Sequence, residues 1–254
     1  MYANLVNNLD ELGFTEVEPY LSEYLTKASK EGIGVQDALI NITDREIKLR
    51  NHRAAQIQIT VSHFPYERTI DGYDYTFQPS VNKAEIKDLA TLRFLERSEN
   101  VLFFGTPGTG KTHLATALGI EAAKHRNITY FITCHDLIQT LRKAYDENRL
   151  EARLKHFSKY KLLIIDEIGY LPIDKTGANL FFQLIAKRYE HNSTIITTNQ
   201  PFSKWGEVFS DAMLANAILD RLLHHAHVIK MVGPSYRTKD YYELLDGDDS
   251  KVGR

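Results

Sequence analysis

The chain has 254 residues, of which 43% are hydrophobic and 25% are charged, a composition typical of a soluble globular protein. Its formal net charge is −2, so any affinity for nucleic acid has to come from local basic patches and not from the field of the whole chain. The single cysteine excludes a disulfide within the chain, and the lack of a signal-peptide pattern or of an apolar run near the roughly 18 residues of a membrane span predicts a cytoplasmic protein without membrane contact.

The first part of the chain is predicted to be helical. Residues 35–59 contain few breakers and carry apolar residues at helical intervals, and this pattern stops before Pro65, which cannot continue a helix. Residues 64–80 hold two prolines, a glycine and several aromatic side chains, which predicts an ordered but irregular connection. A further helix is expected over residues 82–96. We therefore expect a small all-helical N-terminal domain over residues 1–65.

The remainder of the chain, residues 66–254, has a different texture. From residue 100 onward, short apolar runs alternate with helical patterns, and such runs are typical of strands that are buried on both faces of a parallel sheet. The runs are NVLFF, ITYFITC, KLLIIDE, STIITTN and HVIKMV. The order of strand and helix predicts a doubly wound α/β domain.

The stretch GTPGTGKT matches the phosphate-binding pattern G-x-x-x-x-G-K-[ST] in full. Its glycines allow backbone N–H groups to turn toward a phosphate, Lys111 would reach the β- and γ-phosphates, and Thr112 would offer its hydroxyl to Mg²⁺. An apolar strand before it and a helix after it disfavour a chance glycine-rich turn. The predicted nucleotide-binding residues are Gly105, Thr106, Pro107, Gly108, Thr109, Gly110, Lys111 and Thr112.

Two later strands end in polar side chains at the edge of the sheet where ligands of α/β proteins bind. After LLII, Asp166 would hold Mg²⁺ through water, and Glu167 would polarise the water that attacks the γ-phosphate. After STIITT, the amide of Asn199 can both donate to and accept from that water. The alternatives are a strand that ends in a charged turn, and a turn-forming Asn before Pro201.

Two arginines complete the candidate catalytic residues. Arg221 lies near the end of a predicted helix and Arg237 lies just after the last strand. An arginine supplied to the γ-phosphate of a neighbouring subunit would stabilise transition-state charge. The alternatives are a helix-end contact of Arg221, such as a salt bridge to Asp220, and a solvated turn at Arg237.

Together these motifs resemble an AAA+ ATPase, and more closely the IstB family, the helper ATPases of insertion-sequence transposons. The IstB family is in turn similar to the helicase loader DnaC. The resemblance runs from about residue 77 to about residue 242, and more loosely through the N-terminal helices. The segments that carry it are VLFFGTPGTGKTHLATALGIEA, LLIIDEIGYLPIDKTGANLFFQLIAKRYE, STIITTNQPFSKWGEVF and ILDRLLHHAHVI.

The resemblance implies a P-loop AAA+ core with a parallel sheet between helices, and an N-terminal domain that contacts a partner or DNA. It implies an ATP- and Mg²⁺-dependent homo-oligomer that binds and remodels double-stranded target DNA and stimulates a transposase. A loader of a replicative helicase has the same kind of ATPase domain and stays open as the alternative. A nucleotide-dependent phosphotransferase would need an acceptor pocket and a closing lid, for which the sequence offers no segment. About 20 residues follow the last strand, so the C-terminal lid of the family is expected to be reduced or absent.

The resemblance also implies a role for each motif. By motif match, the Walker A residues are Lys111 and Thr112, the Walker B residues Asp166 and Glu167, sensor 1 Asn199, the arginine finger Arg221 and sensor 2 Arg237.

DNA contacts are predicted in the segment from residue 136 to residue 161, which holds seven Lys or Arg against four Asp or Glu. Arg142, Arg149, Arg153 and His156 are expected on one helical stripe, interrupted by Asp146. Tyr170 and Lys175, in the loop after the Asp-Glu strand, are secondary candidates. The alternative is a solvated face with weak ion pairs.

The cluster HHAH, with His224, His225 and His227, raises the question of a metal site. No cysteine or carboxylate near it in the sequence completes a ligand set, and histidines near a helix C-terminus are explained by the helix dipole. The sequence therefore does not predict a metal there.

Overall fold

The computed structural model describes residues 2–14 and 16–239. It divides into two compact units, Met1–Ile57 and Gln58–Arg254. The first unit is helical, as predicted. Its helices are α1 (Tyr2–Glu11), α2 (Glu18–Glu31) and most of α3 (Val35–Val61), which continues into the second unit.

The N-terminal unit has a small core of its own. Val17, Leu21 and Ile42 are its buried residues, and other apolar side chains of α1 and α2 pack around them. Glu46 of α3 is buried beside this core, where it accepts hydrogen bonds from the Arg50 Nε at 2.8 Å and from the backbone N–H of Glu16 at 3.1 Å. A buried carboxylate with two donors is stable because its charge is compensated.

After the end of α3 and an irregular segment, the second unit has two short helices where one was predicted. The expected helix over 82–96 is interrupted, and the structure has α4 (Lys83–Leu89) and α5 (Arg93–Glu96) instead. The single-helix prediction is wrong because Leu92 takes a left-handed backbone conformation with φ of 64°. That turn lets the following Phe94 reach the core.

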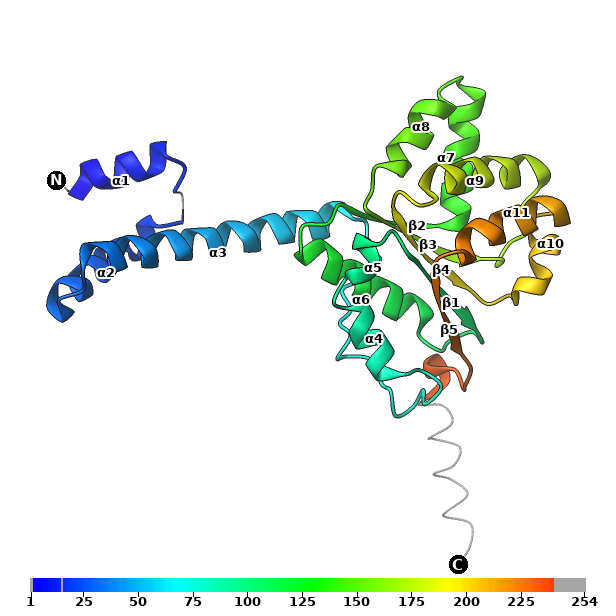
Figure 1. Ribbon diagram of the computed structural model, residues 1–254, viewed down its shortest axis with the longest axis horizontal. Helices are drawn as coiled ribbons and strands as arrows, with labels where there is room; N and C mark the ends of the chain where they lie inside the picture. Colours follow the sequence, from blue (N-terminus) through cyan, green and yellow to red (C-terminus); the bar gives the residue numbers. More distant parts are fainter. Residues whose placement is uncertain (1, 15, 240–254) are drawn as a thin grey trace, which may run out of the picture. The chain divides into compact units, whose positions relative to one another are not determined.

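Five parallel strands form the sheet of the second unit, in the order β2-β3-β4-β1-β5 (Figure 1). All five apolar runs singled out in the sequence are strands, which confirms that part of the prediction. Their bounds are β1 Asn100–Gly105, β2 Thr129–Thr133, β3 Leu162–Ile168, β4 Ser193–Thr198 and β5 Ala226–Met231. Because all strands run the same way, the polar ends of β3 and β4 meet at one edge, beside the loop that follows β1.

Helices cover both faces of the sheet (Figure 1). Successive side chains of a strand point to opposite faces, so Val101 and Phe103 of β1 pack into one core cluster and Leu102 into the other. The first face carries α4, α5 and α6 (Lys111–Lys124). The second face carries α7 (Cys134–Asp146), α8 (Leu150–Ser158), α9 (Lys175–Arg188), α10 (Trp205–Val208) and α11 (Ala212–Leu223). A 3₁₀ turn, η1 (Phe202–Lys204), precedes α10. This is the predicted parallel sheet between helices.

The segment from residue 136 to residue 161 is not one helix. The chain leaves α7 after Asp146, Asn148 is left-handed with φ of 53°, and α8 starts at Leu150. The predicted stripe is therefore broken: Arg142 lies on α7, whereas Arg149 and Arg153 belong to the start of α8.

Arg188, the last residue of α9, is a fully buried cation. Its guanidinium donates to the carbonyl of Phe157 at 2.8 Å, to the carbonyl of Tyr160 at 2.9 Å and to the Thr194 hydroxyl at 3.1 Å, and also to the carbonyl of Ser193. Burial lowers the pKa of this guanidinium, and its hydrogen bonds to the surrounding oxygens compensate the charge that stays on it. These hydrogen bonds tie the end of α8 to the start of β4.

After β5 the structure describes residues 232–239, which include the 3₁₀ turn η2 (Tyr236–Thr238). The rest of the expected reduced lid, residues 240–254, lies outside the described residues. Across residues 2–14 and 16–239, none of the helices is both long enough and apolar enough to span a bilayer.

Candidate nucleotide-binding site

The predicted phosphate loop connects β1 to α6 and is packed against the chain that follows β5. A Cβ atom on Gly105 would lie 1.9 Å from the carbonyl oxygen of Met231, and one on Gly110 would lie 2.5 Å from the Tyr73 ring. Both glycines have positive φ, 143° and 88°. A side chain at either position would therefore displace the loop.

Backbone hydrogen bonds hold this loop in place. The N–H of Thr106 donates to the carbonyl of Met231 at 3.1 Å, and the N–H of Tyr236 donates to the carbonyl of Gly108 at 2.9 Å. The Thr106 hydroxyl donates to the carbonyl of Gly233 at 3.0 Å. These hydrogen bonds connect the loop to η2, so that Arg237 of η2 lines the same cavity as the loop.

Lys111 begins α6 and is almost completely buried. Its Nζ donates to two carbonyls of the loop itself, at 3.0 Å to Gly105 and 2.7 Å to Thr106. Burial lowers the pKa of the ammonium group to about 8, although the nearby Asp166 carboxylate acts in the opposite direction. The ammonium is therefore held inside the loop by weak neutral acceptors, which phosphate oxygens would replace favourably.

Asp166 is buried between two threonine hydroxyls. The Thr112 hydroxyl lies 3.0 and 3.1 Å from the two carboxylate oxygens, and the Thr197 hydroxyl donates to one of them. Burial raises the pKa of Asp166, and the two hydroxyl hydrogen bonds partly offset this. The Thr112 hydroxyl and the Asp166 carboxylate are hard oxygen donors, the kind that fit Mg²⁺.

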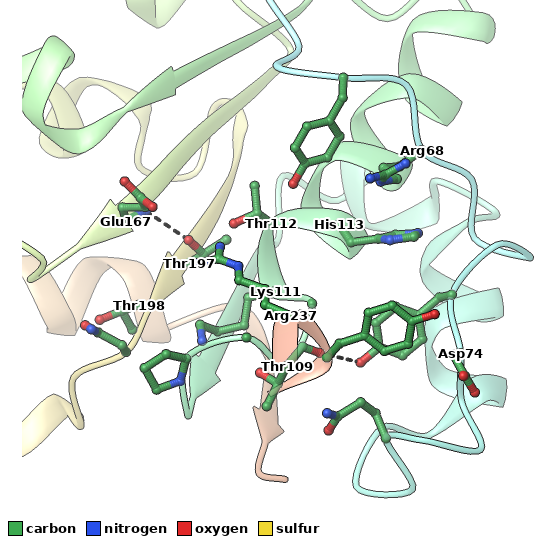
Figure 2. A pocket seen from close by; sticks show the side chains of 18 of the residues that line it. Arg68, Asp74, Thr109, Lys111, Thr112, His113, Glu167, Thr197, Thr198 and Arg237 are labelled. Carbon is green, nitrogen blue, oxygen red and sulfur yellow. Dashed lines mark hydrogen bonds between the residues drawn. The ribbon is translucent and has the colours of Figure 1, made fainter. Parts of the chain in front are cut away.

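Glu167 points away from Asp166 because the strand is irregular at this point. The pairing of β3 with β4 shifts register between Ile165 and Ile168, and Glu167 has a φ of 63°. Its N–H donates to the Thr197 hydroxyl at 2.9 Å, an interaction drawn in Figure 2. The bulge leaves the Glu167 side chain exposed to the cavity while Asp166 stays buried.

Asn199 directly follows β4 and lines the same cavity. Its side-chain oxygen is buried and accepts no hydrogen bond from any residue that the structure describes. A buried acceptor without a partner is costly, so this atom is poised to accept from a bound water or ligand.

The phosphate loop, Lys111, Thr112, Glu167 and Asn199 line one cavity of about 430 Å³, shown in Figure 2. Asp166 is buried next to it on the Thr112 hydroxyl. One wall comes from the irregular segment after α3, which the sequence identified as ordered but did not assign to the site. The Tyr73 hydroxyl donates to the carbonyl of Thr109 at 2.7 Å, Arg68 stacks on Tyr66 at 4.6 Å, and His113 lies 2.9 Å from the carbonyl of Thr69. The lining residues that the sequence analysis did not assign to this site are Tyr66, Arg68, Gly72, Tyr73, Asp74, Gln78, His113, Tyr170, Thr197, Thr198 and Tyr236. The run of aromatic residues between residues 64 and 77 was the available signal.

The two arginines lie in different places. Arg237 lines the cavity, and its charge is one of the causes that lower the pKa of Lys111. Arg221 does not line it; the guanidinium donates to the carbonyl of Ala217 at 3.0 Å and stacks on Phe182 at 4.7 Å. Of the two arginines, only Arg237 therefore lies beside the cavity of its own chain.

The candidate DNA-contacting side chains are partly paired with carboxylates. Arg142 forms an ion pair with Asp174, and Arg149 with Glu147. The Lys175 ammonium lies 3.7 Å from a carboxylate oxygen, that of Asp211, and is largely exposed. This pairing reduces the local basic excess.

Comparison with known proteins agrees with this geometry. Residues 7–243 match the family model described as IstB-like ATP binding protein. The chain is 52% identical over 241 residues to an ATP-binding protein of insertion sequence IS232 from Bacillus thuringiensis subsp. berliner, covering 95% of this chain and 96% of that relative. It is 41% identical over 232 residues to the ATP-binding protein of insertion sequence IS21 from Pseudomonas aeruginosa, covering 91% and 88%.

Solved structures share the fold. The crystal structure of the DnaC helicase loader aligns with a TM-score of 0.52 at 26% identity, over 59% of this chain and 87% of that one. AMPPCP-bound DnaA from Aquifex aeolicus aligns with a TM-score of 0.57 at 17% identity, over 73% of this chain and 56% of that one, a likeness of fold alone. With the AAA+ fold, the complete phosphate loop and these matches, the chain belongs to the family of IstB-like ATP-binding proteins.

Proposed function

We propose that the chain is a Mg²⁺-dependent ATPase that assembles as a homo-oligomer on double-stranded DNA, remodels it and stimulates a transposase during insertion-sequence transposition. The observation that carries the ATPase proposal is the convergence of Lys111, Glu167 and Asn199 on one cavity, beside Asp166, which is buried on the hydroxyl of the lining residue Thr112. These side chains come from the start of α6, from β3 and from the residue after β4. Among the described residues the Asn199 side-chain oxygen has no hydrogen-bond partner, and the Lys111 ammonium donates to loop carbonyls that phosphate oxygens could replace.

In this proposal each side chain has one task. Lys111 exchanges its loop carbonyls for the β- and γ-phosphates, Glu167 polarises the attacking water, and Asn199 orients that water. Thr112 and Asp166 hold Mg²⁺, which neutralises charge on the phosphates when bound. Arg237 adds positive charge from the same chain.

The partners are proposed from the relatives. The proteins from Bacillus thuringiensis and Pseudomonas aeruginosa are named as components of insertion sequences, which supports a transposase as the partner of this chain. The likeness to the DnaC helicase loader supports the alternative, a loader of a replicative helicase. Residues 1–65 are the proposed region for contact with the partner or with DNA, and the cytoplasm is the proposed location.

Electron microscopy and light scattering with ATP and duplex DNA test this proposal. We expect an ordered oligomer that needs both ligands and that Lys111→Ala fails to form. A transposase of an insertion sequence of the same type should bind the oligomer and transfer DNA faster with it. Capture of a replicative helicase in place of the transposase would favour the alternative, and a monomer with every combination of ligands would contradict assembly.

The affinity for ATP should fall as the pH rises above about 8, because the Lys111 ammonium of the free chain has a pKa of about 8. Bound phosphates favour the charged lysine, so binding takes up a proton above that pH, and affinity should drop by up to about tenfold per pH unit until the pKa of the bound state is reached. The phosphates themselves titrate at about pH 6 and do not contribute.

Fluorescence titration with labelled ATP across this range measures the effect. Lys111→Ala should abolish stable binding at every pH, and Lys111→Arg should bind without the slope because arginine stays charged. A native affinity that is flat between about pH 8 and about pH 10 would contradict the assignment of Lys111.

Replacing Arg149 and Arg153 by Ala should weaken DNA binding in the ATP-assembled state about equally for all sequences. Phosphate contacts carry no base identity, and each one lost removes about 0.9 from the log–log slope of affinity against salt. The buried Leu154 and Phe157 of α8 stay in place, so the fold should persist. Anisotropy of labelled duplex over a salt series, with and without ATP, gives the slope.

The matched control is Arg93→Ala with Arg97→Ala, which removes two exposed arginines from the opposite face of the sheet. This control should keep the native slope. An unchanged slope in the Arg149 and Arg153 variant would make the start of α8 an ordinary solvated surface.

A further inference from the structure

The structure brings a carboxylate to the histidines at the end of α11. The sequence analysis did not expect a metal there because no cysteine or carboxylate near them in the sequence completes a ligand set, but the fold supplies a carboxylate from a distant part of the chain. Glu190, from the turn between α9 and β4, has its Oε1 3.7 Å from His224 Nδ1 and 3.9 Å from His225 Nε2. The three side chains offer ligand atoms that all lie within 4.8 Å of one another.

The surroundings of this cluster suit a cation. His224 is the C-terminal cap of α11, where the unpaired carbonyls of the helix carry partial negative charge. The Tyr189 hydroxyl lies 2.7 Å from His224 Nδ1 and has to turn away from this nitrogen when the nitrogen binds an ion. All three side chains are about half exposed, so a water molecule can reach the same point.

We propose that Glu190, His224 and His225 bind a first-row transition-metal ion, with Zn²⁺ as the representative ion, and that water completes the coordination. Two imidazole nitrogens and one carboxylate oxygen are a ligand set of zinc, whereas Mg²⁺ and Ca²⁺ prefer oxygen throughout. Zinc ligands at about 2.1 Å in a tetrahedron lie about 3.4 Å apart. Small rotations of these exposed side chains would shorten the distances from Glu190 Oε1 to the two histidine nitrogens, 3.7 and 3.9 Å, to that value.

The site would join two elements that are separate in the chain. Glu190 belongs to the turn that leads into β4, and His224 closes α11, one helical turn after Arg221. A bound ion would fix the last turn of α11 against this connection. It would therefore restrain the backbone that carries Arg221, while the metal binding itself stands whether or not the ATPase proposal does.

Zinc titration of the untagged full-length chain against a chromophoric chelator tests the proposal, because a histidine tag would bind the ion. We expect one site per chain. His224→Ala and His225→Ala should each lower the affinity by about 100-fold or more, beyond the roughly 10–100-fold typical of residues outside the coordination shell. The absorption spectrum of the Co²⁺ complex should indicate tetrahedral coordination in the native chain and lose that signature in both variants.

The control is His125→Ala, which removes an exposed histidine that pairs with Glu121 at 3.5 Å. It should leave the affinity unchanged. Circular dichroism checks that the variants fold, and His225→Gln provides a second test of similar size. The proposal is overturned if the native chain has no saturable single site, or if such a site survives when His224 and His225 are both replaced.

Discussion

The Glu167→Gln variant is expected to bind ATP with native affinity and to hydrolyse it about 10²–10⁴-fold more slowly. The amide keeps the size of the side chain but cannot take up a proton from the attacking water. The bulge in β3 separates this residue from its neighbour, because Asp166 stays buried on Thr112 and Thr197 while Glu167 faces the cavity. The substitution should therefore spare the oxygen donors proposed for Mg²⁺. Trapped in the ATP state, the variant should also hold DNA longer.

Single-turnover hydrolysis measures this effect, with ATP affinity determined separately by fluorescence titration. Glu207→Gln is the matched control, because Glu207 is an exposed glutamate on α10. This variant should hydrolyse ATP at the native rate. If Glu167→Gln turns ATP over at the native rate, this residue merely ends a strand and the attacking water is activated by another group.

Arg221→Ala should lose hydrolysis by about 10³–10⁵-fold, the effect of removing an arginine that stabilises the transition state in a neighbour's site. The variant should still bind ATP as a monomer, because Arg221 does not line the cavity of its own chain. Its present partners are the carbonyl of Ala217 and the ring of Phe182, neither of which involves the nucleotide.

Mixing distinguishes an action between subunits from a structural role. In mixtures of Arg221→Ala with Lys111→Ala, sites form where the intact phosphate loop of one variant meets the intact arginine of the other. Random assembly at equal amounts gives such sites at roughly a quarter of the interfaces, so part of the activity should return. Phe182→Leu removes the stacking but keeps the arginine, and it should stay active. Mixtures that are inactive at every ratio would make Arg221 a structural residue.

The sheet and the phosphate loop could be predicted from sequence because their signals are local. Strands buried on both faces are continuously apolar, so the five apolar runs were sufficient to predict the five strands. The phosphate loop needs glycine, lysine and a hydroxyl at fixed spacing, so its motif was sufficient to locate it. The polar ends of β3 and β4 also followed, since parallel strands bring Asp166, Glu167 and Asn199 to one edge.

Features that depend on distant contacts could not be predicted. The left-handed residues Leu92 and Asn148 break helices inside sequences of good helical periodicity. Thr197 looked like an ordinary strand residue until the fold put its hydroxyl between Asp166 and the Glu167 amide. Glu190 reaches the histidines of α11 only through tertiary structure.

The buried Arg188 also has a mechanical consequence. Helices α7 and α8 form a hairpin whose exposed tip is at residues 147–149, and the guanidinium clamps the base of α8 to Ser193 and Thr194 at the start of β4. The hairpin is therefore anchored at its base. A force on its tip would be transmitted to the first residues of β4, a fully buried strand whose other end leads directly to Asn199.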